Sequence, residues 1–175
     1  MRRLLLPFFL VLFFLVISFT LLIHTSFARI TPEDIVNQQR EDYQSKVNKY
    51  SQSNRKKLED LSAKIASLNK KATDQYTQVM DNQALILDEY QKRLGGGSNQ
   101  ATENARYWLT FAHEAVAYQA AKIYIFSLTN ETNLKGDANL LISQLQSDIS
   151  TLRGKVIKSQ NIIRNLLLSS TNGGR

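Results

Sequence analysis

The segment LEDLSAKIASLNKKATDQYTQVMDNQALILDEYQKRL, residues 58–94, decides the fold, because apolar residues recur in it at helical spacing without an interrupting glycine or proline. Its stripe starts upstream at Tyr43 and has a mean spacing of about 3.64 residues. This spacing predicts a long, nearly straight amphipathic helix that needs a packing partner. The stripe consists of Tyr43, Val47, Tyr50, Asn54, Leu58, Leu61, Ile65, Leu68, Ala72, Tyr76, Val79, Gln83, Ile86, Tyr90 and Leu94.

The residues on either side set the limits of this helix. The sequence TPED at 31–34 offers a capping threonine, a proline suited to the first helical position and two acids at the positive end of the helix dipole. No further helix breaker occurs before the glycines at 95–97, so the sequence predicts one helix over 32–94. Apolar positions are sparse in its first part. We therefore expect a helical stalk over 29–57 and a packed distal half over 58–94.

Two further helices are predicted after a glycine-rich turn at 95–99. Residues 100–128 carry apolar residues on two faces, which predicts a central helix that is covered on more than one side. The sequence TNETNLKG at 129–136 breaks the pattern, and Asp137 is expected to cap the third helix. That helix ends before a tail at 172–175. Its apolar stripe consists of Leu141, Leu145, Ile149, Leu152, Val156, Ser159, Ile163 and Leu166.

These segments together predict an all-α fold. The long helix and two shorter helices, the latter within 100–171, are expected to form an antiparallel, coiled-coil-like three-helix bundle. If the break at 129–136 is only a kink, the alternative is an extended two-stranded helical hairpin. The bundle is favoured because residues 100–128 have two faces to bury.

The first 28 residues predict membrane targeting. Arg2 and Arg3 precede twenty uncharged residues at 4–23, which as a helix would cover about 30 Å, the thickness of a hydrocarbon core. The arginines are expected to stay cytoplasmic, so a retained segment makes a single-pass membrane protein with an extracytoplasmic C-terminal domain. Small residues at 26 and 28 also allow cleavage after Ala28, which would leave a secreted or periplasmic protein. Both outcomes remain open.

Composition argues against several chemistries. The chain has no cysteine, which excludes disulfides and thiolate metal sites, and its net charge of +7 is too modest to predict specific nucleic-acid binding. His113-Glu114 begins like a zinc-protease motif, but position 117 is alanine, so the second histidine ligand is missing. We find no catalytic, cofactor-binding or metal-ligating set, and expect a protein that is not an enzyme.

Three groups of residues are candidates for interaction. Two are basic and one is aromatic, and each also has a simpler structural interpretation, as a solvated helix face or as core packing. The candidates are Arg55, Lys56, Lys57, Lys64, Lys70 and Lys71; Trp108, Phe111 and Tyr118; and Arg153, Lys155 and Lys158.

The leading hypothesis is a membrane-anchored, non-enzymatic coiled-coil protein of the cell envelope. It would bind another protein or itself, with self-association through the sparse stripe at 35–61. The alternative is a soluble exported binding module or holdase-type chaperone that uses the aromatic and basic faces. That alternative resembles, in architecture only, the helical basic chaperones of the bacterial periplasm. A weaker hypothesis is contact of the basic runs with anionic lipid or polymer.

Overall fold

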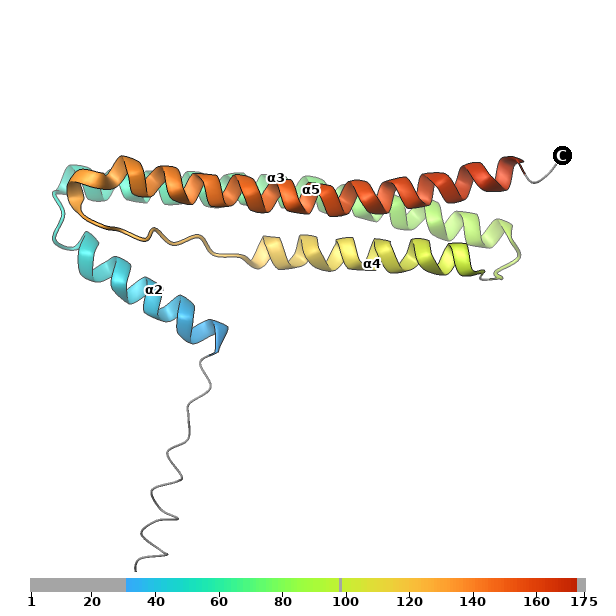
Figure 1. Ribbon diagram of the computed structural model, residues 1–175, viewed down its shortest axis with the longest axis horizontal. Helices are drawn as coiled ribbons and strands as arrows, with labels where there is room; N and C mark the ends of the chain where they lie inside the picture. The colour runs from blue at the N-terminus through green and yellow to red at the C-terminus, as the bar shows by residue number, and fades with distance from the viewer. Residues whose placement is uncertain (1–30, 98, 173–175) are drawn as a thin grey trace, which may run out of the picture. The chain divides into compact units, whose positions relative to one another are not determined.

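The computed structural model describes residues 31–97 and 99–172, and this part of the chain is helical and contains no strand (Figure 1). The all-α prediction is confirmed. The elements are α2 (Pro32–Val47), α3 (Gln52–Arg93), α4 (Gln100–Ala121), the short 3-10 helix η1 (Glu131–Asn133) and α5 (Leu134–Asn172).

The predicted targeting segment at 4–23 and the cleavage site after Ala28 lie outside the described residues. Of the helices that the structure does describe, none is both long enough and apolar enough to cross a membrane.

The chain divides into two compact units after Gln38. The described part of the first unit is the beginning of α2, which starts where the sequence predicted. The backbone N–H and the hydroxyl of Thr31 both donate to Asp34 Oδ2 at 2.7 Å, and the Thr31 hydroxyl accepts from the Asp34 N–H at 3.2 Å. This is a reciprocal capping box. The bonds from Thr31 lower the pKa of the Asp34 carboxyl.

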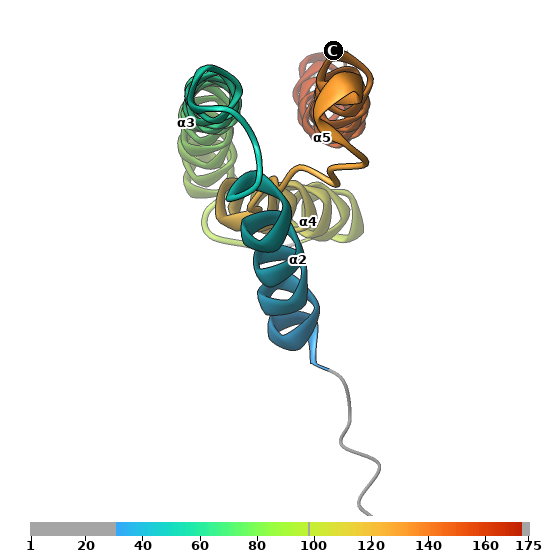
Figure 2. The same ribbon diagram turned by 90° about the vertical axis from the view of Figure 1, so that its left-hand side faces the viewer.

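The second unit contains a three-element helical bundle. The helices α3 and α4 run in opposite directions, α5 reverses again, and the end view places the three at the corners of a triangle (Figures 1 and 2). The break after α4 is therefore a reversal rather than a kink, which rules out the two-stranded hairpin. Gly95 and Gly96 make the first turn with φ of +73° and +77°, values that side-chain-bearing residues rarely adopt.

The prediction of one unbroken helix over 32–94 is wrong. α2 ends at Val47, and α3 begins at Gln52 behind Ser51, whose side chain accepts from the Asn54 N–H. The turn lets Val47 and Tyr50 pack into the same core as the beginning of α3. Long-range bonds hold the turn, because Glu131 Oε1 accepts from the Ser51 N–H at 2.7 Å and from Asn54 Nδ2 at 2.9 Å.

The predicted stripe on α3 is correct at most positions after Ile65, because Gln83 is buried and Tyr76, Val79 and Tyr90 pack against the core. It is wrong at a few positions. Leu68 and Ile86 are about half exposed, whereas their neighbours Asn69 and Leu87 are buried. α3 is covered by both α4 and α5, so its buried face does not follow the apolar residues alone. The α5 stripe fits the prediction, since nearly all of its positions are buried: Leu141, Leu145, Leu152, Val156, Ser159, Ile163 and Leu166.

The second predicted helix, 100–128, is also too long. α4 has 22 residues and ends at Ala121, and residues 122–130 are extended. The 42 residues of α3 cover about 63 Å and those of α4 about 33 Å. Nine extended residues at about 3.3 Å each cover the remaining ~30 Å. The third leg of the bundle, by which we mean α4 together with residues 122–130, is therefore half helix and half extended chain.

The predicted cap of the third helix is wrong as well, because α5 begins at Leu134 and is nearly as long as α3. Asp137 lies buried in the first turn of α5. Its carboxylate accepts from the Thr129 N–H at 2.8 Å and thereby fixes the end of the extended segment.

The core has two parts, one for each half of the third leg. The part around α4 includes small residues such as Ala105 and Ala112, which allow close helix approach. In the other part, Phe126 and Leu128 of the extended segment fill the place of a helix face. The first part consists of Met80, Leu87, Ala105, Leu109, Ala112, Val116, Leu152, Val156, Ile163 and Leu166. The second consists of Val47, Tyr50, Leu58, Ile65, Phe126, Leu128, Ala138, Leu141 and Leu145.

Candidate interaction surface

A polar network at the end of α4 fixes the position of this helix between α3 and α5. Gln119 Nε2 donates to Asn69 Oδ1 at 2.8 Å and to the Tyr124 hydroxyl at 2.6 Å. Asn69 Nδ2 donates in return to the Gln119 carbonyl at 2.9 Å. On α5, Asp148 Oδ2 accepts from the Tyr124 hydroxyl at 2.7 Å and from Lys122 Nζ at 2.5 Å. Each of the side chains named in this network has a hydrogen-bond partner within it.

The network changes the acidity of two of its members. Burial raises the pKa of Tyr124 to about 12, and its hydrogen bond to Asp148 contributes in the same direction. Burial alone would raise the pKa of Asp148 too, but the hydrogen bonds from Lys122 and Tyr124 outweigh it, so the pKa is lowered. Asp148 therefore stays ionised beside a neutral tyrosine, which suits a structural role.

Four aromatic side chains lie on α4 on the side next to α5. Tyr107 and Tyr118 are 61 % and 74 % exposed, Phe111 is 36 % exposed, and Trp108 is partly buried. The rings of Tyr107 and Phe111 both meet Trp108 edge-on, each with a centroid distance of 5.5 Å. Residues 107, 111 and 118 are spaced to share one helix face, so the exposed rings form a row.

Two lysines of α5 cover part of this row. Lys158 Nζ lies 3.5 Å from the centroid of the Trp108 ring, and Lys155 Nζ lies 4.9 Å from that of Phe111. Both distances are within the range of cation–π attraction. We call Tyr107, Trp108, Phe111, Tyr118, Lys155 and Lys158 the aromatic–lysine surface.

A groove of about 310 Å³ continues this surface between α4 and α5. Its α4 wall carries the acid Glu114 and its α5 wall carries the base Lys155, while the Lys122–Asp148 pair lies at one end. The volume is at the lower limit for small-molecule sites. The groove is lined by Phe111, Glu114, Ala115, Tyr118, Gln119, Lys122, Asp148, Thr151, Leu152 and Lys155.

The structure brings together five of the predicted interaction residues and leaves out the others. Trp108, Phe111, Tyr118, Lys155 and Lys158 meet in one place, although they come from two helices. Arg153 does not join them, because two residues of helix separate it from Lys155 by about 200° of rotation. Sequence reasoning missed Tyr107 and Glu114. The signal for Tyr107 was its spacing of four residues from Phe111.

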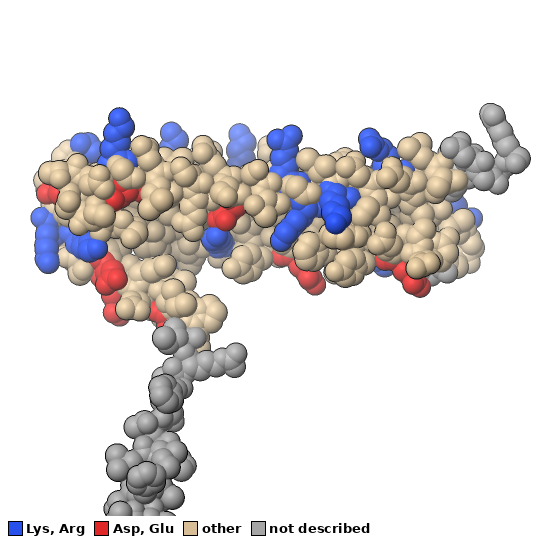
Figure 3. Space-filling view, in the orientation of Figure 1, with Lys and Arg blue, Asp and Glu red and all other residues tan. Residues whose placement is uncertain are grey.

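The basic run of α3 lies apart from this surface. All six of its residues (Arg55, Lys56, Lys57, Lys64, Lys70 and Lys71) are exposed. Lys70 pairs with Asp74 at 2.7 Å, and Lys57 donates to Asn54 Oδ1 at 3.1 Å. Lys and Arg side chains are scattered over the face seen in Figure 3 and do not gather into one dense stripe.

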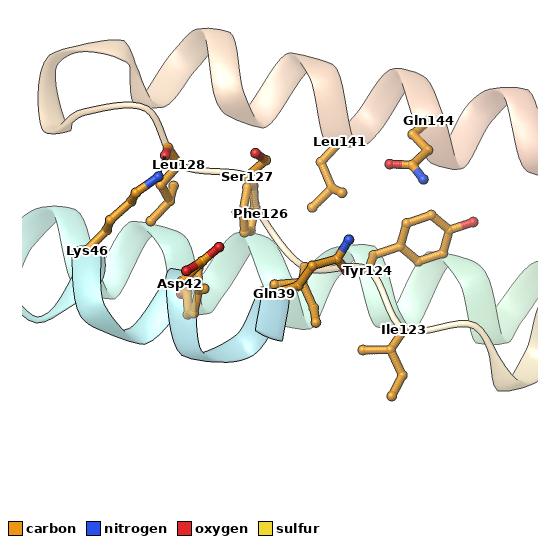
Figure 4. Close-up of a pocket in the computed structure, with 12 residues that line it drawn as sticks. Gln39, Asp42, Lys46, Ile123, Tyr124, Phe126, Ser127, Leu128, Leu141 and Gln144 are labelled. Atoms are coloured by element: carbon orange, nitrogen blue, oxygen red, sulfur yellow. Dashed lines mark hydrogen bonds between the residues drawn. The ribbon is translucent and has the colours of Figure 1, made fainter. Parts of the chain in front are cut away.

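A second hollow, of about 190 Å³, borders the extended segment (Figure 4). Lys46 Nζ donates there to the Leu128 carbonyl at 2.5 Å, and Tyr43 stacks on Phe126 at 6.4 Å. These contacts join α2 residues to the extended segment. The hollow is smaller than the usual ligand pocket, and its contacts are those of a core edge.

His113, which begins the incomplete zinc-protease motif, lies beside an acid of α3. His113 is partly buried, and its Nε2 lies 3.5 Å from Asp81 Oδ1. Within residues 31–97 and 99–172, no three His, Cys, Asp or Glu residues come close enough together to hold a metal ion.

Comparison of the chain with protein-family models, with curated proteins and with solved structures finds no match.

Proposed function

We propose that this chain is a non-enzymatic interaction protein, directed to a membrane by residues 4–23, and that it binds protein through the aromatic–lysine surface. The observation that carries the proposal is the row of exposed rings at Tyr107, Phe111 and Tyr118. Aromatic residues that stay exposed beside positive charges are enriched in protein interfaces, where they contribute most of the binding energy. Burying one such side chain contributes about 1.5–3 kcal/mol.

The proposal places the interaction on α4 and α5 and not on the stripe at 35–61. The sequence predicted self-association through that stripe, because no other segment of the chain was expected to cover its apolar residues. In the structure Val47, Tyr50 and Leu58 are buried by the chain's own residues, including Phe126 and Leu141. These three residues offer no apolar surface to a second molecule, and only Ile35 at the start of the range is an exposed large apolar residue.

The membrane part of the proposal rests on the sequence. Two arginines followed by twenty uncharged residues support a retained anchor with the helical part outside the cytoplasm. Cleavage after Ala28 would instead release the helical part. Intact-mass measurement of the protein from its native cells distinguishes the two, because a mature start at Arg29 contradicts the anchor.

Photo-crosslinking tests the interaction. A photoreactive residue in place of Tyr118, in the full chain and in its native membrane fraction, is expected to give a discrete protein adduct. The matched control is the same residue in place of Leu85, which is a similarly exposed apolar position on α3. Equal labelling at the two positions, or no adduct at Tyr118, would contradict the proposal.

A second candidate function, the holdase-type chaperone, is favoured by the openness of the same surface. Exposed rings next to lysines in a shallow groove also suit unfolded polypeptides of many sequences. A holdase would give many adducts from position 118 and would suppress aggregation of a model client. A single adduct without such suppression supports the specific interaction protein.

A further inference from the structure

The α4–α5 groove has one acid and one base besides its bonded Lys122–Asp148 pair, and they lie on opposite walls. Glu114 is exposed on the α4 wall, and Lys155 lies on the α5 wall with its Nζ over the Phe111 ring. The groove's remaining charged pair, Lys122 and Asp148, is bonded at 2.5 Å and contributes no net charge. Outside the Lys122–Asp148 pair, the groove is therefore acidic at Glu114 on α4 and basic at Lys155 on α5.

A surface of this kind is complementary to itself. A two-fold axis along the groove places α4 of one copy over α5 of the other, and every contact occurs twice. The basic wall of each copy then faces the acidic wall of its partner. A groove with two basic walls would repel a second copy, whereas this one attracts it.

The register of the two helices fits such pairing. Phe111 of α4 lies level with Lys155 of α5, as their cation–π contact shows. Glu114 follows Phe111 by three residues, which is about 4.5 Å along the helix. Rotation about an axis along the groove preserves this level, so Glu114 of one copy comes within reach of the flexible Lys155 side chain of the other.

We infer that the partner bound at the aromatic–lysine surface is a second copy of this chain, related by a two-fold axis along the groove. The inference rests on the proposed function, because it names the partner of the same surface. Tyr107 and Tyr118 are the apolar contacts of the dimer, and the pair Glu114–Lys155, formed twice, sets its register.

The exposed rings also indicate how strong the dimer is. Aromatic side chains of about 150–250 Å² each, at the exposures found here, offer roughly 300 Å² per copy. A stable interface of standard size buries about 800 Å² per partner. The aromatic row alone supports a weak, reversible dimer, and a shared membrane would favour it by raising the effective concentration.

Charge exchange tests the inference directly. In the full chain, in detergent, Glu114→Lys or Lys155→Glu alone is expected to weaken dimerisation about tenfold, because each places two like-charged pairs in the interface. An equimolar mixture of the two variants is expected to restore the dimer, since every pair is then again of opposite charge. The double variant in one chain is expected to dimerise as well as the unchanged protein. Sedimentation equilibrium measures all four.

A control variant distinguishes a loss of folding from a loss of the dimer interface. Leu85→Lys adds a charge at an exposed site of α3 and is expected to leave dimerisation unchanged. Helical circular dichroism checks that every variant is folded. A monomeric unchanged protein, or single variants that dimerise normally, would overturn the inference. So would a mixture that fails to restore the dimer.

Different crosslinking results would contradict the inferred dimer and the proposed function. If position 118 crosslinks only to a different protein, the second copy is the wrong partner and the proposed interaction surface stands. If position 118 gives no adduct in the native membrane fraction, the proposed function fails together with the inference.

Discussion

Lys158 Nζ lies 3.5 Å from the centroid of the Trp108 ring, so a cation from α5 covers the single tryptophan of the chain. This contact connects two helices whose aromatic and basic residues are separated by fifty positions in the sequence. It also provides an optical reporter, because tryptophan emission depends on the charge and solvent next to the indole.

Removing that charge should have a small and local effect. Lys158→Met keeps the aliphatic stem and removes the ammonium, and it is expected to lower the free energy of unfolding by about 0.5–1 kcal/mol. It should also change the emission of Trp108. Lys135→Met, at an exposed lysine of the same helix, is the control and should change neither. Identical emission of the Lys158 variant and the unchanged protein would argue against the contact.

The network at the end of α4 predicts a larger loss. Asn69→Leu removes the acceptor of Gln119 Nε2 and the donor to the Gln119 carbonyl, both in a buried place. Unsatisfied buried groups cost about 1–3 kcal/mol, and urea denaturation should show a loss of that size. Asn82→Leu on the exposed side of the same helix is the matched control and is expected to be nearly neutral. A neutral Asn69 variant would mean that water replaces both bonds.

Tyr124 predicts an alkaline transition. Burial raises its pKa from the ordinary tyrosine value of 10.0 to about 12 in the folded protein. Because the folded state favours the neutral phenol, the stabilisation is complete below pH 10 and is lost as the pH rises towards about 12. Tyr124→Phe cannot ionise and should show a shallower loss of stability across this window. Tyr118→Phe, at an exposed tyrosine, should follow the unchanged protein. Chemical denaturation at a series of pH values measures the slopes.

The extended segment should be anchored by one side chain. Phe126 is 3 % exposed and stacks on Tyr43, so Phe126→Ala is expected to cost about 3–5 kcal/mol. Ile123, in the same segment, is 54 % exposed, and its replacement by alanine should stay within about 0.5 kcal/mol. Similar losses at the two positions would show that the segment is not held as the structure has it. Thermal unfolding followed by circular dichroism compares them.

Much of the architecture was predictable because it depends on local pattern. The helix start at Thr31 follows from a capping box of neighbouring residues, and the turn at Gly95 follows from backbone freedom that other residues lack. The α5 stripe was predictable because one face of that helix packs against the bundle along its whole length.

The wrong predictions concern helix ends that depend on contacts with residues far away in the sequence. Nothing between Ala121 and Ser127 forbids a helix, yet α4 ends at Ala121, and the contacts that hold this end include the bond from Gln119 to Asn69, fifty positions away. The isoleucine-rich and aromatic composition of 123–126 was a weak signal for extended chain. The turn before α3 likewise depends on Glu131, eighty positions from Ser51. In the interaction surface, Lys155 and Trp108 could be named from sequence, but their distance from each other could not.

The third element of the bundle consists of α4 followed by the extended segment 122–130, and the boundary between the two sets its length. Each residue that passed from the extended segment into α4 would shorten the leg by about 1.8 Å, the difference between the two rises per residue. One added turn of helix would thus shift Phe126 or Leu128 several ångströms along the bundle and out of the core position that it fills. The length of α4 and the length of the extended segment are therefore fixed together by the core residues at the end of the segment. This fixed length keeps the Trp108 and Phe111 rings of α4 level with Lys158 and Lys155 of α5.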